Sequence, residues 1–197
     1  MPQLLVIAGC NGAGKSSFSQ VLSPDAVEVF DYDKHYLRIY QSLIPTEFQE
    51  TMAHNMAFGE LEKQIQEAID RRQSFSYETN FNSTPLHWPA VFKKNHYEVN
   101  MIYFCLDSIA EAKRRVAIRV ENNGHYVPDA EIEKRFREGY ANLNKHFEFF
   151  DNLHLFNSSF YNRTPQYCVS FQKGKLIKKD HLPHFFKDVI PALYSAS

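Results

Sequence analysis

The stretch IAGCNGAGKSSFS, residues 7–19, runs from a strand-like segment through a group of glycines to a lysine and two serines. Residues 9–16 satisfy the pattern G-x-x-x-x-G-K-[ST], which is typical of the P-loop that binds nucleotide phosphates. Glycines let the backbone turn until several N–H groups point at phosphate oxygens, and the N-terminus of the following helix adds partial positive charge. We therefore predict a nucleotide site formed by Gly9, Asn11, Gly12, Ala13, Gly14, Lys15, Ser16 and Ser17.

Three side chains of this loop have predicted roles. Lys15 would neutralise charge between the β- and γ-phosphates of ATP, and the hydroxyl of Ser16 would bind Mg²⁺. The alternative is a glycine-rich turn without a ligand, but the loop follows a predicted strand and opens a predicted helix, as phosphate binding requires. We interpret Cys10 as a small apolar filler; the alternative is a thiol whose pKa is lowered by the helix N-terminus, which would make the site oxidation-sensitive.

The composition favours one packed domain over residues 1–197, with 44% hydrophobic residues and abundant Phe and Tyr. A formal net charge of -1 argues against broad electrostatic binding to nucleic acid or to anionic membranes. No apolar run reaches the ~18 residues of a membrane span, and the N-terminal stretch is interpreted as a first strand, not a signal peptide. Three widely spaced cysteines favour reduced thiols in a cytoplasm.

Apolar runs typical of buried strands alternate with segments of helical spacing. We therefore predict an α/β fold of the P-loop NTPase class, a three-layer sandwich with a parallel sheet of about five strands and helices on both faces. A hairpin and a short helix would close the chain. The predicted strands are residues 4–8, 26–30, 74–80, 99–107 and 152–158, and the predicted hairpin is 166–179. One predicted helix starts near Lys15, and two others span about residues 46–72 and 129–150.

Ligands of such folds collect at the carboxyl ends of the parallel strands. Gly9, Asp33, Glu78 and Asp107 follow or end predicted strands, so we expect them along one edge of the sheet. A GTPase switch would need an N-K-x-D element, but residues 144–147 read NKHF inside a predicted helix. A motor ATPase would need a larger chain and a strand ending in Asp-Glu. A small P-loop kinase remains.

Further stretches narrow this prediction. VFDYDKHY (29–36), YETN (77–80) and RRVAIRVENNGHYVPDAEIEKRF (114–136), together with the glycine loop, resemble the zeta toxin family in its short, single-domain form. The resemblance runs from about residue 3 to about 158. It implies an ATP- and Mg²⁺-dependent kinase whose acceptor is a hydroxyl of a nucleotide sugar such as UDP-N-acetylglucosamine. It also makes a separately encoded antitoxin a possible protein partner.

The resemblance assigns roles to four residues on the acceptor side. Asp33 matches the catalytic base, which would take the proton of the acceptor hydroxyl and align its oxygen. The alternative is that Asp33 caps a helix beginning at Lys34. Asp31 would lie near the metal. Glu78 would contact the acceptor or the metal and Thr79 the acceptor, although Glu78 could also be a solvated residue at a strand end.

Three further assignments concern the nucleotide. Arg115 and Arg119 share one helix face and would clamp the β- and γ-phosphates under a lid of about residues 107–128; an ordinary solvated basic face is the alternative. Arg135 also matches a family arginine. Asn157, followed by Ser158, would lie near the adenine, with a simple turn as the alternative.

The sequence departs from the family at two places. Where the short form has Glu-Thr-Thr, this chain has Asn80 as the third residue, and where the family has Gly-Gly-His, it has Asn123-Gly124-His125. Asn tolerates the left-handed conformation, so the second turn can survive, with His125 stabilising it. The departure at Asn80 leaves the identity of the acceptor open. Two alternatives therefore stand: a metabolic or resistance kinase that acts on another small acceptor, and a nucleotide-binding protein without transfer activity.

Overall fold

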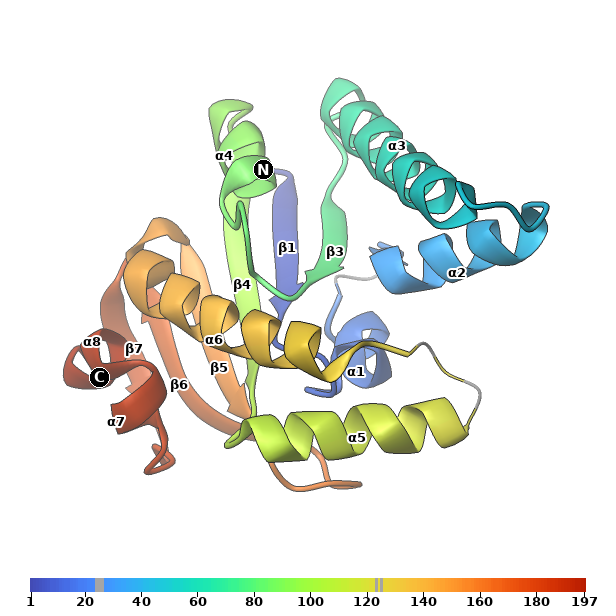
Figure 1. Cartoon of the computed structure of the whole chain (residues 1–197). Helices are drawn as coiled ribbons and strands as arrows, with labels where there is room; N and C mark the ends of the chain where they lie inside the picture. The colour runs from blue at the N-terminus through green and yellow to red at the C-terminus, as the bar shows by residue number, and fades with distance from the viewer. Residues whose placement is uncertain (24–26, 123, 125) are drawn as a thin grey trace.

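The computed structural model describes residues 1–23, 27–122, 124 and 126–197 (Figure 1). Within them the strands form one seven-stranded sheet in the order β2-β3-β1-β4-β5-β6-β7. The first five strands in the chain run parallel, and the last two are antiparallel to their neighbours. The strands are β1 (Gln3–Ala8), β2 (Val29–Phe30), β3 (Phe75–Thr79), β4 (Glu98–Cys105), β5 (Asn152–Asn157), β6 (Gln166–Gln172) and β7 (Lys175–Lys179).

The predicted fold class is therefore confirmed, including five parallel strands and a C-terminal hairpin. The hairpin β6–β7 is not a separate element, because β6 pairs with β5 and extends the sheet. The second predicted strand begins at Ala26, which lies outside the described residues; the described part of it is Val29–Phe30.

The helices are α1 (Lys15–Leu22), α2 (Tyr32–Ser42), α3 (Gln49–Asp70), α4 (His87–Lys94), α5 (Ile109–Glu121), α6 (Asp129–His146), α7 (Phe186–Val189) and α8 (Pro191–Ser195). Two helices differ clearly from the prediction. The helix predicted to reach residue 150 ends at His146 and continues as one 3₁₀ turn, Phe147–Phe149. The single short helix predicted at the end is two helices, because Pro191 disfavours helical backbone at Ile190 before it.

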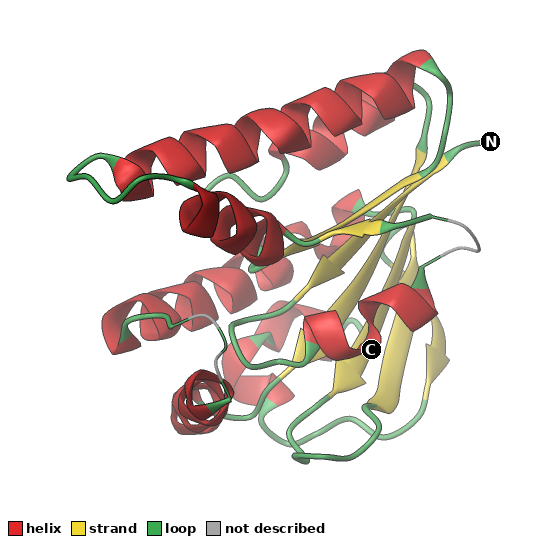
Figure 2. Cartoon of the chain, turned by 90° about the vertical axis from the view of Figure 1, so that its right-hand side faces the viewer, coloured by secondary structure: helices red, strands yellow, loops and turns green. Residues whose placement is uncertain are grey.

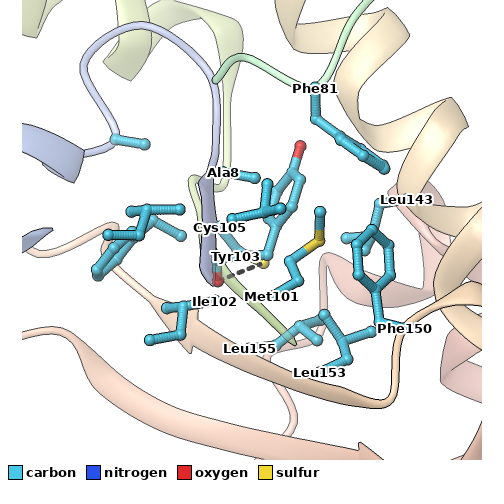
Figure 3. Packing of buried hydrophobic residues seen from close by; sticks show 14 of the residues in the cluster. Ala8, Phe81, Met101, Ile102, Tyr103, Cys105, Leu143, Phe150, Leu153 and Leu155 are labelled. Carbon is cyan, nitrogen blue, oxygen red and sulfur yellow. Dashed lines mark hydrogen bonds between the residues drawn. The ribbon is translucent and has the colours of Figure 1, made fainter. Parts of the chain in front are cut away.

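Helices pack on both faces of the sheet. On one face Phe18 of α1 stacks against Phe104 of β4, with ring centroids 6.1 Å apart. On the other face Tyr140 of α6 packs against Tyr103 and donates a hydrogen bond to the Leu106 carbonyl at 2.6 Å. Figure 3 shows the apolar interior of this second face, where side chains of β1, β4 and β5 meet Leu143 and Phe150. The core is thus continuous with the strand ends that position the loop of residues 9–14.

Helices α2 and α3 form a hairpin beside the β2–β3 edge of the sheet (Figures 1 and 2). Figure 2 shows the long α3 running along one side of the molecule. The two helices have a small core of their own, made by Tyr36, Ile39, Ala53 and Ala57. No helix in the described part of the chain combines the length and the apolar character needed to cross a bilayer.

Candidate active site

The glycine loop connects the end of β1 to the first residue of α1, as the sequence predicts. Its backbone needs glycine at defined positions. A Cβ on Gly9 would lie 2.6 Å from the carbonyl oxygen of Phe104, and Gly14 caps α1 in the left-handed region with φ 87°. The loop can therefore pass close to β4 and present the N-terminus of α1 to a ligand.

Lys15 folds back over this loop. Its Nζ donates hydrogen bonds to the carbonyl oxygens of Gly9 at 2.7 Å and Cys10 at 3.3 Å, and to Oδ1 of Asn80 at 3.2 Å. The ammonium group is thus held where the loop meets the end of β3. Sequence reasoning placed Lys15 in the loop but missed its bond to Asn80.

Ser16 and Glu78 form the next contact, with Oγ of Ser16 donating to Oε2 of Glu78 at 2.8 Å. Burial raises the pKa of Glu78 above its ordinary value, while the nearby Lys15 opposes this shift and Asp31 adds to it. Glu78 is therefore a half-buried, hydrogen-bonded residue at the end of β3. Hydroxyl and carboxylate oxygens are the ligands that Mg²⁺ prefers, so Ser16 and Glu78 are a suitable pair to hold it beside nucleotide phosphates.

Two cavities adjoin at this point. The larger has a volume of about 590 Å³ and lies over the glycine loop; the smaller has a volume of about 310 Å³ and lies toward α2 and α3. Lys15, Asp33 and Glu78 line both cavities. Besides these three, the larger is lined by residues 11–14 and 16–18, Arg115, Ile118, Arg119, Asn122, Ser158 and residues 160–165. The smaller is lined by Asp31, Tyr32, Tyr36, His54, Phe58, Leu61, Tyr77, Thr79, Asn80, Asn82, Thr84, Pro85, Trp88 and Arg135.

Asp31 and Asp33 have different local positions. Asp31 is the N-cap of α2, and its Oδ1 accepts a hydrogen bond from the backbone N–H of Lys34 at 3.1 Å. The alternative that Asp33 is the cap is therefore wrong, because Asp33 lies inside the first turn of α2. Its carboxylate is left to line both cavities.

The arginines of α5 lie at the larger cavity. Arg115 is nearly buried, with 9% of its side chain exposed, and its guanidinium pairs with Glu111 at 2.6 Å and donates to the Gly12 carbonyl at 3.3 Å. Its Nη2 is buried and has no hydrogen-bond partner among the described residues. Hydrogen bonds from Arg114, and also from Arg115, hold the pKa of Glu111 at about 2 despite its burial. The alternative of a solvated basic face is wrong for Arg115.

Two other predicted arginines also lie beside the cavities. Arg119 lines the larger one, and Gly124 packs against it so closely that a Cβ there would lie 2.4 Å from Cγ of Arg119. Arg135 of α6 lines the smaller one, pairs with Glu131 at 2.8 Å and reaches Oδ1 of Asn11 at 3.4 Å.

Asn157 does not line either cavity. It is buried, and its Oδ1 accepts a hydrogen bond from the N–H of Ser159 at 3.0 Å, as expected for a turn. The next residue, Ser158, lines the larger cavity. Asp107 also lies away from both cavities, with its N–H bonded to Ser159.

Comparison with known proteins assigns the chain to a family. The family model described as "Zeta toxin" matches residues 1–168. The chain belongs to the zeta toxin family. A search of curated proteins gave no match.

Solved structures similar to this zeta toxin family member support the fold. A chain of the PezAT chromosomal toxin–antitoxin system of Streptococcus pneumoniae is 17% identical with a TM-score of 0.63, over 84% of this chain and 69% of that one. A chain of the AvrRxo1-ORF1:AvrRxo1-ORF2 complex with sulphate ions is 14% identical with a TM-score of 0.66, over 90% and 60%. A chain of the Pnkp1/Rnl/Hen1 RNA repair complex is 23% identical with a TM-score of 0.55, over 76% and 46%. The present chain thus spans about half the length of the last.

Some features of this zeta toxin family member were missed by sequence reasoning. One is the segment 160–165, where the ring of Tyr161 lies under the guanidinium groups of Arg114 and Arg115, at 4.9 and 5.5 Å. Another is the aromatic lining of the smaller cavity, where His54 stacks on Tyr36 with centroids 4.2 Å apart and bonds to the Tyr32 hydroxyl. The spacing of Tyr32 and Tyr36, four residues apart on one helix, was the only available signal.

Two remaining predictions concern Cys10 and the turn after α5. Cys10 is 2% exposed, and burial raises the pKa of its thiol to about 12. The alternative of a thiol with lowered pKa is therefore wrong, and the apolar filler interpretation is confirmed. The predictions made for Asn123 and His125 fall outside the described residues.

The pKa of Glu78 leads to a stability prediction. Because burial raises it, the folded protein binds the proton more tightly than the unfolded chain, so stability falls as pH rises from the ordinary carboxyl value through the folded pKa. Glu78→Gln keeps an oxygen that can accept from Ser16 and removes this penalty. We expect a higher melting temperature than wild type at neutral pH, by about 2–4 °C for each kcal/mol gained.

Differential scanning fluorimetry from pH 4 to 8 checks this expectation. The melting temperatures of the two proteins should converge at acid pH, where Glu78 is protonated. A Gln variant less stable than wild type at neutral pH would mean that attraction to Lys15 outweighs burial.

Proposed function

We propose that the protein is an ATP-dependent kinase that transfers the γ-phosphate of ATP to a hydroxyl of a small acceptor. The observation that supports this most is the pair of adjoining cavities that share Lys15, Asp33 and Glu78. A single nucleotide-binding pocket would suffice for a protein that only binds ATP. A second cavity, reached through a lysine and two carboxylates, provides space for an acceptor beside the γ-phosphate.

The larger cavity would hold ATP. The backbone N–H groups of Asn11, Gly12 and Gly14 and the N-terminus of α1 would bind the phosphates, with Lys15 between the β- and γ-phosphates. The orphaned Nη2 of Arg115 is a donor that a phosphate oxygen would satisfy, and Arg119 lines the same cavity. Bound Mg²⁺, held by Ser16 with Asp31 and Glu78 nearby, would neutralise phosphate charge. We further propose that residues 107–128, which contain α5, act as a lid within a single domain of residues 1–197.

The smaller cavity would hold the acceptor. In the transfer step Asp33 takes the proton of the acceptor hydroxyl, the acceptor oxygen forms a bond to the γ-phosphorus, and the bond from that phosphorus to the β,γ-bridging oxygen breaks. ADP leaves with the bridging oxygen, and Asp33 later returns its proton to solvent. Glu78 and Thr79 would contact the acceptor from the end of β3.

A nucleotide sugar such as UDP-N-acetylglucosamine is our first candidate acceptor, from family membership. A second candidate is another small alcohol, as for a metabolic or resistance kinase. The aromatic lining of the smaller cavity, with Tyr32, Tyr36 and Trp88, would also suit other ring-bearing acceptors. A separately encoded antitoxin is a proposed partner, since one structural neighbour comes from a toxin–antitoxin system.

An acceptor screen tests this proposal. Without acceptor we expect slow ATP hydrolysis, because water is poorly positioned in the cleft. Adding the correct sugar nucleotide should raise ADP production well above this background and give a phosphorylated product by mass spectrometry. Product from an unrelated alcohol, with none from a panel of UDP-sugars, would retain the kinase and reject the nucleotide-sugar acceptor. Absence of product from every acceptor, despite ATP binding, would favour a nucleotide-binding protein without transfer activity.

A further inference from the structure

Asn80 connects the two cavities through one hydrogen bond. It lines the smaller cavity, and its Oδ1 accepts a hydrogen bond from Nζ of Lys15, a residue that lines both cavities. The contact therefore lies where the phosphate and the acceptor would meet in the proposed site.

The ammonium group of Lys15 has no donor left for a phosphate in this arrangement. A lysine has three N–H donors, and Nζ has three acceptors: the carbonyls of Gly9 and Cys10 and Oδ1 of Asn80. A phosphate oxygen can bind Nζ only when one of these three is released. Two of them are backbone oxygens of the glycine loop itself, whereas Oδ1 belongs to a side chain that can rotate.

The backbone that carries Asn80 is held firmly. The next residue, Phe81, has φ 57° and is fully buried, with its N–H bonded to Thr79 Oγ1 at 3.0 Å and its carbonyl accepting from Asn142 at 2.9 Å. Figure 3 shows Phe81 beside Tyr103 and Phe150 in the apolar interior. Gly139 of α6 also packs against the Asn80 carbonyl, since a Cβ there would lie 2.7 Å from its oxygen. These contacts keep the backbone of Asn80 and Phe81 in place when the side chain of Lys15 moves toward a phosphate.

We propose that Asn80 is a positioning residue that holds Lys15 against the glycine loop and competes with ATP for the third N–H of its ammonium group. This inference rests on the proposed ATP site. A charged phosphate oxygen forms a stronger bond with an ammonium group than a neutral amide oxygen does, so ATP displaces Asn80. Because the Lys15–Asn80 bond must break when ATP binds, it lowers the affinity for ATP, and Asn80 thereby sets how tightly the site binds its nucleotide.

Substitutions that remove or strengthen this bond test the proposal by changes of opposite sign. Asn80→Ala removes the competitor, so we expect the Kd for Mg·ATP to fall by roughly two- to tenfold, the range of one ordinary hydrogen bond. Asn80→Asp replaces the amide by a carboxylate that pairs with Lys15 and repels the phosphate, so the Kd should rise by roughly ten- to hundredfold. Isothermal titration calorimetry with Mg·ATP and no acceptor measures both changes.

Asn95 offers the control, since it lines neither cavity and its side-chain amide donates to the Val91 carbonyl. Asn95→Ala should leave the Kd for Mg·ATP within about twofold of wild type. Melting temperatures without nucleotide report whether each variant folds, and Asn80→Ser replaces Asn80→Ala if the latter does not. A general structural role for Asn80 would weaken ATP binding in both variants.

The outcomes separate this inference from the proposed function. If wild type fails to bind Mg·ATP, the proposed function is wrong and the role of Asn80 goes with it. If wild type binds and Asn80→Ala weakens binding or leaves it unchanged, the positioning role alone is overturned. Tighter binding by Asn80→Ala together with weaker binding by Asn80→Asp supports it.

Discussion

Replacing Lys15 by alanine should abolish the stabilisation of the protein by Mg·ATP. ATP that binds the folded state at 100 times its Kd stabilises it by about 2.7 kcal/mol, which for a chain of this size raises the melting temperature by roughly 5–10 °C. Lys15 supplies the positive side chain common to the two cavities and closest to the glycine loop, through its bond to Gly9 at 2.7 Å. Without it, the β- and γ-phosphates lose their main neutralising charge, and phosphoryl transfer should fall to background.

Two further variants show whether the charge is responsible. Lys15→Met keeps the length of the side chain without its charge and should behave like the alanine variant. Lys145→Ala removes a positive charge from an exposed position on α6, outside both cavities, and should retain the full thermal shift. Equal thermal shifts in wild type and Lys15→Ala would exclude the larger cavity as an ATP site.

The glycine loop was predictable because its pattern is local. Phosphate binding needs glycine, lysine and serine in a fixed order between a strand and a helix, and all of these lie within residues 7–19. The position of Glu78 beside the glycine loop was also predictable, since the carboxyl ends of parallel strands lie on the same side of the sheet. Its bond to Ser16 across 62 positions of sequence agrees with this prediction.

The parts that sequence reasoning missed depend on contacts between distant segments or on local backbone geometry. The Asn80–Lys15 bond requires the turn at Phe81, whose positive φ is maintained by packing against α6. Asp31 and Asp33 both follow β2, and the sequence alone does not show which of them caps α2. The backbone conformation shows that Asp31 is the cap. Helix α4 was missed because its eight residues, HWPAVFKK, contain Pro89 and too few turns for a clear period.

Asp33→Asn should reduce turnover by roughly 10²- to 10⁴-fold, the usual contribution of a positioned general base, while ATP affinity holds. The amide is nearly the same size as the carboxylate but cannot take the proton of the acceptor hydroxyl. Asp33 lines both cavities, and the cap of α2 is Asp31, so the substitution leaves the capping bond to Lys34 in place. Single-turnover phosphoryl transfer and calorimetric ATP binding measure the two quantities separately.

The position of Asp33 in the first turn of α2 requires one control, because an acid there also stabilises the helix through its dipole. Asp129→Asn makes the same change in the first turn of α6, outside both cavities; because it also removes the 3.3 Å ion pair with Lys113, it gives an upper limit for the stability lost with such an acid. If Asp33→Asn loses only as much stability as Asp129→Asn and yet loses turnover, the proton-accepting role is supported. Unchanged turnover would make Asp33 a helix-stabilising residue, and lost ATP·Mg²⁺ binding would make it part of the metal site; either result would move the catalytic base elsewhere in the smaller cavity.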